Sequence, residues 1–290
     1  MSRILVLINP KSRSGAAARE SICETLSKHN HSITIPEDDG SDCNEYLLKH
    51  HASFDYILVG GGDGSVNYVL PSLVKTQIPV IVYPLGTANN FARTYGLTAE
   101  MDDLLKLIED GKVVEVDLGI VNDIYFLSVA GLGLSTEVNL KVSSWLKRHL
   151  GVFAFILTAF QMMFKMNPFR AWIRKDKEDE VRSKSWQISV CNGKYYGSGL
   201  TIKHNATLDD GKLHLLSTEV KSIWNGFVLI PSFMTGKYKK DQDITLFSAK
   251  EIHIKTRRVF KIDVDGDIKT TTPATFSLAP KSLKVLVPVN

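Results

Sequence analysis

The stretch from Tyr56 to Ser65, YILVGGGDGS, constrains the fold of this chain more than any other. An apolar run typical of a buried strand enters a glycine-rich turn, and a helix is predicted over residues 65–73. Glycine has no Cβ, so this backbone can take positive φ and lie close against another group. The free N–H groups at the start of the helix would favour an anion, phosphate above all.

Asp63 is the unusual member of this turn. A carboxylate beside a phosphate repels it unless a cation lies between them. A nucleotide phosphate site with Mg²⁺ nearby would account for the acid. A tight strand-to-helix turn in which Asp63 caps the helix accounts for it equally well. On this stretch alone, both interpretations stay open.

The composition sets outer bounds. A chain of 290 residues with 44% hydrophobic residues can bury one large core or two modest ones. The net charge of +4 does not indicate a dedicated nucleic-acid binder, and it is compatible with approach to an anionic membrane. The three scattered cysteines fit a reducing compartment, and the apolar run after Arg3 is too short for a signal peptide. We therefore expect a cytoplasmic protein.

Strands and helices alternate through the first third of the chain. Strands are predicted over 4–8, 32–35, 56–59 and 79–83, and helices over 16–28, after Asp42 with Glu45 as a capping box, over 65–73, and from Thr98 as cap to about 110. This order predicts a parallel sheet with right-handed crossovers. Ligands of such sheets bind at the carboxyl ends of the strands, where the loops after Ile8 and Val59 lie.

A third loop, PLGTANNFAR at 84–93, falls at the same edge. Thr87, Asn89 and Asn90 could hold phosphate or ribose oxygens, or the asparagines could simply cap the following helix. Three such loops after three successive strands are harder to explain as ordinary turns. Together they favour a nucleotide site.

The second half of the chain reads as an all-β module. A hairpin is expected over 115–130 around Asn122-Asp123, and two strands should flank a solvated charged tip at 175–180. Strands are predicted over 171–174, 185–192, 213–218, 251–256, 259–264, 274–278 and 282–289, with a helix over 222–238 that Pro231 kinks or breaks.

The stretch from Leu150 to Phe164, LGVFAFILTAFQMMF, is almost continuously apolar and is flanked by basic residues. It is shorter than the roughly 20 residues that a transmembrane helix needs. It is either a buried helix at the domain interface or an amphiphilic surface helix whose basic flanks meet lipid headgroups.

Taken together, these motifs resemble the bacterial diacylglycerol-kinase-type lipid kinases, which are related to sphingosine kinases and NAD kinases. The resemblance rests on the Asn9-Pro10 loop, GGGDGS at 60–65 with Asn67, PLGTANNFAR at 84–93, VDLG at 116–119, NGKYYG at 192–197, DDG at 209–211 and DGD at 265–267. It implies an N-terminal Rossmann-like parallel α/β nucleotide-binding domain and a C-terminal β-sandwich domain. Residues 1–122 would bind ATP, with the tail from about 280 to 290 packing back on them, and residues 123–279 would bind the lipid.

The resemblance also implies roles for individual residues. Backbone groups of Gly61, Gly62, Asp63, Gly64 and Ser65 would hold the ATP phosphates, together with Asn67 and Thr87, while Asn9 and Thr34 would line the nucleotide pocket. Mg²⁺ would be held by the Asp210 side chain and the main-chain oxygens of Thr207 and Lys212. An ordinary Asp-Gly hairpin turn is the alternative for that loop.

The catalytic residues implied are three acids. Asp267 would be the general base, Asp117 would assist it, and Asp63 would act through Mg²⁺ or its waters. Asp267 stands where the family usually carries glutamate, and Asn90 stands where it usually carries aspartate. These two departures put the substrate and the turnover in question.

Other functions stay open beside the lipid kinase. An NAD kinase would be expected to carry an Asn-Glu pair where Val66-Asn67-Tyr68 stands, and a phosphofructokinase would carry an Asp-Asn-Asp run after Gly86-Thr87. A non-catalytic nucleotide- or lipid-binding regulator is the remaining alternative. The partners we expect are a lipid substrate and peripheral membrane contact, without nucleic acid, and we allow for a homodimer.

Overall fold

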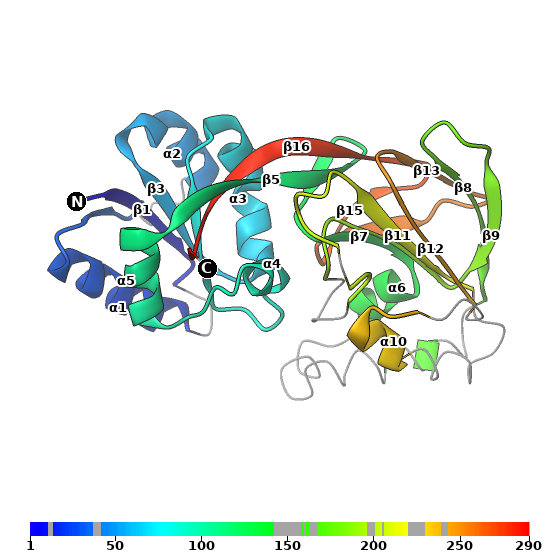
Figure 1. Ribbon diagram of the computed structural model, residues 1–290, viewed down its shortest axis with the longest axis horizontal. Helices are drawn as coiled ribbons and strands as arrows, with labels where there is room; N and C mark the ends of the chain where they lie inside the picture. Colours follow the sequence, from blue (N-terminus) through cyan, green and yellow to red (C-terminus); the bar gives the residue numbers. More distant parts are fainter. Residues whose placement is uncertain are drawn as a thin grey trace. The chain divides into compact units, whose positions relative to one another are not determined.

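The computed structural model describes residues 1–10, 14–36, 42–141, 158, 161–162, 167–195, 201–204, 206–219, 230–238 and 243–289. The chain divides into two compact units, which Figure 1 shows with their elements labelled. Unit 1 contains residues 1–117 and 281–290, and unit 2 contains residues 118–280. Unit 1 is a parallel α/β structure and unit 2 is an antiparallel β-sandwich, so the expected fold class is confirmed.

Unit 1 is built around a parallel sheet with the strand order β2-β1-β3-β4-β16. Its strands are β1 (Arg3–Ile8), β2 (Ser32–Thr34), β3 (Tyr56–Gly61), β4 (Val80–Pro84) and the last part of β16 (Ala274–Val287), which also pairs with β5 (Lys112–Val121). Ile4, Leu5 and Ile57 are fully buried, as expected for parallel strands that are covered on both faces.

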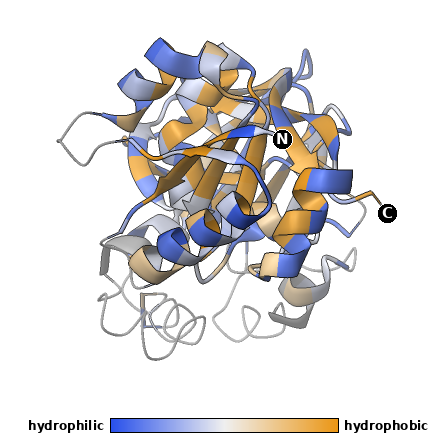
Figure 2. Cartoon of the chain, turned by 90° about the vertical axis from the view of Figure 1, so that its left-hand side faces the viewer, coloured by the Kyte–Doolittle hydropathy of each residue, from blue (hydrophilic) through white to orange (hydrophobic). Residues whose placement is uncertain are grey.

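Helices cover both faces of this sheet. On one face α1 (Gly15–Lys28) contacts α5 (Met101–Asp110), and on the other α2 (Cys43–His50) contacts α3 (Asp63–Thr76). The right-handed crossovers from β1 to β2 and from β3 to β4 run in opposite directions along the sheet, which places α1 and α3 on opposite faces. Figure 2 shows the strands of this unit in hydrophobic orange, with hydrophilic blue on the flanking helices.

Two helix caps were predicted, and one of them is wrong. Asp42 caps α2 as expected, because its side chain accepts the N–H of Asn44 at 3.0 Å. The N-cap of α5 is Glu100, not Thr98. The Thr98 hydroxyl instead accepts the N–H of Glu100 and donates to Asp103, so it holds the turn that leads into the helix.

Unit 2 is a sandwich of two antiparallel sheets, β12-β11-β10-β7-β14-β15 and β16-β13-β8-β9. Side chains of both sheets, such as Val190 and Leu215 of one and Ile254 and Phe276 of the other, form one hydrophobic core. The strands are β6 (Ile124–Phe126), β7 (Val129–Gly133), β8 (Phe169–Lys175), β9 (Val181–Ser185), β10 (Gln187–Cys191), β11 (Leu213–Thr218), β12 (Ile244–Ala249), β13 (Ile252–Thr256), β14 (Lys261–Val264) and β15 (Asp267–Thr271).

Several predicted strands of unit 2 need correction. The strand expected over 185–192 is β10, and the strand that follows the charged tip is instead β9, of which only Ser185 lay in the expected range. Trp186 separates the two strands, and its backbone bonds to Leu134 and Thr218. The two strands expected over 274–278 and 282–289 are one, β16, although Lys281 within it has a φ of 50°. Strands β12 and β15 were not predicted from the sequence.

Three short helices complete the described part of the chain: α4 (Asn90–Thr94), α6 (Leu134–Lys141) and α10 (Ile230–Thr235), besides the 3₁₀ turn His51–Ser53. Residues 222–229 of the helix expected over 222–238 lie outside the described residues, as does most of the apolar stretch 150–164. Within the described ranges, we find no helix that is both long enough and apolar enough to cross a bilayer.

Candidate functional site

Three loops of unit 1 meet at the carboxyl edge of its parallel sheet. The register pairs Ile8 with Gly60 and Gly60 with Tyr83, so the residues that follow these strands lie side by side. The chain leaves β1 toward β2 and leaves β3 toward β4, in opposite directions along the sheet. Such a switch point leaves a crevice in which α/β proteins bind their ligands. Asn9 and the glycine turn after β3 flank it.

The glycine turn is packed against the loop that follows β4. A Cβ on Gly86 would lie 2.5 Å from the Cα of Gly62 and 2.6 Å from the Asn89 side-chain oxygen. A Cβ on Gly61 would lie 2.1 Å from the Ser65 hydroxyl. The two loops therefore touch backbone to backbone, which side chains at these positions would prevent.

Asp63 joins the same two loops. Its carboxylate accepts the N–H of Asn90 at 2.9 Å and the N–H of Phe91 at 3.1 Å, at the start of α4. The interpretation of Asp63 as the cap of its own helix is therefore wrong, because the N-cap of α3 is Gly62 and Asp63 caps α4 instead. Asn90 is itself buried.

The start of α3 offers donors to an anion. Asp63 and Gly64 are its first two residues, and N–H groups at these positions have no partner within a helix. The helix dipole adds partial positive charge at this end. Of the remaining predicted residues, Asn67 is buried in α3, Ser65 is half-buried in its first turn, and Thr87 is exposed in the loop after β4. Thr34 lies further away, at the end of β2, which β1 separates from β3.

The Asn89 side chain serves its own loop. It accepts the N–H of Gly86 at 3.1 Å and donates to the Gly86 carbonyl at 2.7 Å, with Asn89 at a φ of 47°. The amide therefore shapes the turn, and it makes no side-chain cap bond to α4.

Asp117 lies at the end of unit 1. The residue is 7% exposed, and its carboxylate accepts the N–H of Lys281 at 2.9 Å, so it fastens β16 to β5 within that unit.

We expect Gly86→Ala to lower ATP affinity at least about tenfold, because the new methyl group must push the two loops apart. Glu109→Ala, at an exposed position in the last turn of α5, is the control, because it lies outside the predicted nucleotide residues. Calorimetric titration with ATP measures both. Equal affinities for the two variants would contradict the packing argument.

In unit 2, the DGD motif forms the turn between β14 and β15. Val264 pairs with Asp267, and the two residues between them, Asp265 and Gly266, have positive φ of 51° and 102°. Such a two-residue turn with positive φ at both positions is typical of tight hairpins. Asp267 is exposed at the start of β15.

Asp265 has a structural role that was not predicted from the sequence. Its carboxylate accepts three backbone N–H groups at 2.7 to 3.0 Å, from Leu127, Ser128 and Val129. These bonds explain why the strand expected over 124–130 is broken into β6 and β7. Asp265 therefore fixes the turn from which Asp267 projects.

The predicted metal loop contains Asp210 and precedes β11. One Asp210 oxygen accepts the N–H of Lys212 at 3.0 Å, and the other contacts Nε2 of His214 at 3.0 Å. The His214 side chain is fully buried. Burial lowers the pKa of His214, although Asp210 opposes this, so the imidazole is neutral at pH 7.

A chain of hydrogen bonds fixes the tautomer of His214. Lys203 donates to the Ser248 hydroxyl at 3.2 Å, and this hydroxyl lies 2.8 Å from Nδ1 of His214. With Ser248 donating to Nδ1, the Nε2–H of His214 donates to Asp210. His214 was missed by the sequence interpretation, and a single histidine within the apolar strand LHLLST was the signal that could have found it.

This loop fits Mg²⁺, which prefers oxygen ligands and keeps several waters. It offers one carboxylate whose orientation is fixed by a buried histidine, and main-chain oxygens of Thr207 and Lys212 are close in sequence. Among the described residues, no group of three or more His, Cys, Asp or Glu side chains could hold a metal ion. A metal here would depend on carbonyls and waters beside Asp210.

A hollow of about 330 Å³ lies elsewhere in unit 1, beside α5, with Lys106, Leu107 and Val289 in its lining. It contains none of the predicted nucleotide residues. We therefore place the candidate site at the glycine loops, where the donors and the switch point are.

A parallel α/β unit with glycine loops at its switch point, followed by a β-sandwich, defines the class of nucleotide-dependent small-molecule and lipid kinases. Residues 3–121 match the family described as the diacylglycerol kinase catalytic domain. Residues 128–287 match the YegS C-terminal NAD kinase beta sandwich-like domain. The chain belongs to the bacterial diacylglycerol-kinase-type lipid kinase family, and it is a kinase by that membership.

Individual relatives agree with this assignment. A diacylglycerol kinase of Mycobacterium tuberculosis is 26% identical over 99% of this chain and 96% of its own length. A protein of Bacillus anthracis, whose crystal structure is provisionally described as that of a diacylglycerol kinase, has a TM-score of 0.82 at 26% identity and covers 99% of this chain and 95% of its own. An uncharacterized protein of Synechocystis is 30% identical over 81% of this chain, which spans only 55% of that relative.

Proposed function

We propose that this protein transfers the γ-phosphate of ATP to a hydroxyl group of diacylglycerol or a related lipid, in a reaction that depends on Mg²⁺. One observation carries this proposal: the Asp63 carboxylate joins the glycine turn after β3 to the loop after β4, at the switch point of the sheet. Phosphoryl transfer needs positioning and charge stabilisation more than covalent chemistry from the protein. A rigid pair of loops with helix N–H groups beside them supplies both.

Within unit 1, the phosphates of ATP would lie against the N–H groups of residues 61–65 at the start of α3. The Thr87 hydroxyl and Asn67 would add neutral polar contacts, and Asn9 and Thr34 would line the nucleotide pocket. The charge of the ATP phosphates would be partly neutralised by Mg²⁺. Neutral hydrogen-bond donors suit such a ligand, because they hold the phosphate oxygens without adding a second positive charge that would repel the ion.

In the reaction, the lipid hydroxyl oxygen forms a bond to the γ-phosphorus as the bond from that phosphorus to the β,γ-bridging oxygen breaks, and ADP leaves. The hydroxyl proton must go to a base. Asp267 is the proposed base: it is exposed, and within the described part of the chain its carboxylate has no hydrogen-bond or ion-pair partner. Asp117, proposed to assist, is held by Lys281.

Mg²⁺ would be held by the Asp210 side chain and the main-chain oxygens of Thr207 and Lys212. When bound, the ion would neutralise negative charge and orient oxygen ligands. His214 would keep the Asp210 carboxylate in one orientation, because metal-binding carboxylates depend on such supporting hydrogen bonds.

We expect His214→Leu to weaken Mg²⁺ binding by about 10- to 100-fold, since the Asp210 carboxylate loses its donor. His214→Gln is the matched variant, because its amide can still donate toward Asp210, and it should keep affinity closer to that of the wild type. Calorimetric titration with Mg²⁺ measures affinity without turnover. If Leu and Gln variants of equal stability bind alike, His214 does not orient the carboxylate.

The activity is tested by transfer of radiolabelled phosphate from ATP to diacylglycerol, other lipid alcohols, NAD and fructose 6-phosphate. We expect label in a lipid product. Label in NAD would support an NAD kinase instead. Tight ATP binding without transfer to any acceptor would overturn the enzyme and favour a nucleotide-binding regulator.

A further inference from the structure

The outer face of the sheet β13-β8-β9 in unit 2 is rich in cationic side chains. In β8, alternate residues from Phe169 to Ile173 are buried in the sandwich core. Strand alternation therefore turns Arg170, Trp172 and Arg174 to the opposite face. The two arginines are exposed and the tryptophan is half-buried.

The register brings like charges together on this face. Arg170 pairs with Lys184, and Trp172 lies between Arg182 on β9 and Lys255 on β13. Like charges directly opposite each other destabilise a sheet. Among the described residues, no carboxylate lies within 4.0 Å of the basic groups of Arg170, Arg182 or Lys184. The directly opposed pair Arg170 and Lys184 is therefore a pair of like charges that an anionic ligand would stabilise.

The loop after β13 adds further cationic side chains at the end of the sheet where β8 begins. Arg257 and Arg258 are exposed, and the side chain of Val259 between them and Phe260 is 71% exposed. The ring of Phe260 packs on Phe169 with centroids 4.4 Å apart, which anchors the loop beside the start of β8. The basic face is defined as Arg170, Trp172, Arg182, Lys184, Lys255 and the loop 257–259.

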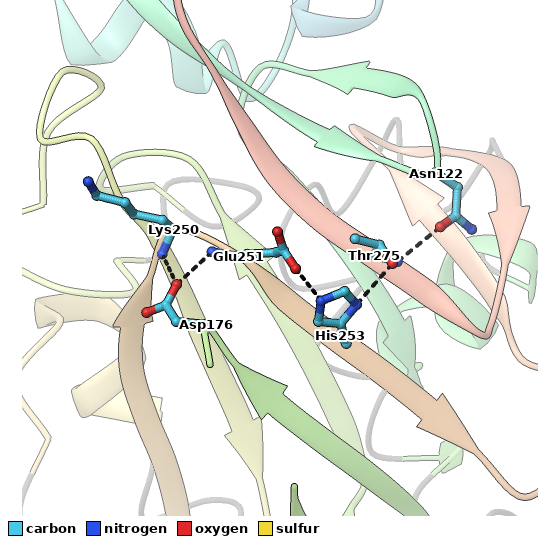
Figure 3. A network of polar contacts seen from close by, with 6 residues as sticks. All are labelled: Asn122, Asp176, Lys250, Glu251, His253 and Thr275. Atoms are coloured by element: carbon cyan, nitrogen blue, oxygen red, sulfur yellow. Dashed lines mark hydrogen bonds and ion pairs between the residues drawn. The ribbon is translucent and has the colours of Figure 1, made fainter. Parts of the chain in front are cut away.

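The acids of this sheet are held at its other end. Figure 3 shows His253 bonded to both Glu251 and Thr275, and the Asp176 carboxylate accepting the N–H groups of Lys250 and Glu251 at 3.0 Å. Beyond this network, the Glu180 carboxylate lies 3.9 Å from the Lys255 ammonium group. The basic face therefore keeps most of its positive charge.

We propose that the basic face is a docking surface for an anionic lipid membrane. Charge complementarity favours lipid headgroups. The exposed Val259 beside Arg258 and the half-buried Trp172 suit the boundary between headgroups and acyl chains. The inference rests on the proposed function only in that a lipid kinase must meet its substrate in a bilayer.

The test is cosedimentation of the full chain with phosphatidylcholine vesicles that contain or lack phosphatidylglycerol. We expect binding only to the anionic vesicles, weakening as salt is raised. The variant Arg170→Glu/Arg182→Glu/Lys184→Glu should bind them more than about 100-fold more weakly, at roughly fivefold for each lost cation. The control Lys49→Glu/Lys75→Glu/Lys112→Glu changes three exposed lysines of unit 1 by the same charge and should bind like the wild type.

Further measurements separate this inference from the proposed function. Transfer to a short-chain, water-soluble diacylglycerol should be unchanged in the basic-face variant, while transfer to lipid in anionic vesicles falls with binding. If the triple variant does not fold, Arg170→Gln and Val259→Asp should each weaken vesicle binding. Equal vesicle binding by the basic-face variant and the control, or binding to a polynucleotide but not to anionic vesicles, would overturn the docking surface.

Discussion

Replacing Asp267 by asparagine is expected to lower the rate of phosphoryl transfer by about 10²- to 10⁴-fold and to leave ATP affinity unchanged. Asp267 begins β15 with an exposed side chain. Asparagine has nearly the same volume but cannot accept the proton of the lipid hydroxyl. Single-turnover transfer rates and ATP titrations measure the two quantities separately.

Two neighbouring substitutions sharpen this test. Asp267→Glu should retain transfer, because it keeps the carboxylate and extends it by one methylene. Asp265→Asn should lower the melting temperature, since the Asp265 carboxylate accepts three backbone N–H groups. Asp267→Asn should not lower it. Transfer at the wild-type rate by Asp267→Asn would remove Asp267 as the base.

The fold of unit 1 could be predicted because long apolar runs mark its central strands β1, β3 and β4. Their continuous apolar residues, as in Ile4–Ile8 and Tyr56–Val59, are enough to predict buried strands, and the loops with glycine that follow mark the strand ends. Unit 2 was harder because its missed strands bury little surface: β15 has no buried residue, and β12 has only Ala249. Without a buried face there is no alternating hydrophobic pattern to detect.

The site residues were easier to name than their partners. A motif can place Asp63 in a glycine turn, but the N–H groups it binds lie 27 and 28 residues further along the chain. The Asp265 carboxylate reaches back 136 to 138 residues, and His214 contacts a serine on the next strand of its sheet. These contacts depend on how the sheets assemble, which local patterns do not encode.

Asp63→Asn is expected to lower kcat/KM at least about 100-fold, with a loss of ATP affinity as part of the effect. The carboxylate accepts the N–H groups of Asn90 and Phe91, and an asparagine would direct its own NH₂ group at one of these donors. Hydrogen bonds to a charged group contribute about 1.5–3 kcal/mol each. Losing one would let the loop after β4 move away from the glycine turn.

Asp42→Asn is the matched control, because Asp42 also accepts a backbone N–H at a helix start, away from the glycine loops. It should change stability slightly and leave transfer unaffected. Residue 90 is an asparagine in this chain, so it provides no second carboxylate that could take over the role of Asp63. If Asp63→Asn keeps the kcat/KM of the wild type, the bond between the loops does not serve catalysis. If only the variant's ATP affinity falls, Asp63 acts on nucleotide binding and not on the transfer step.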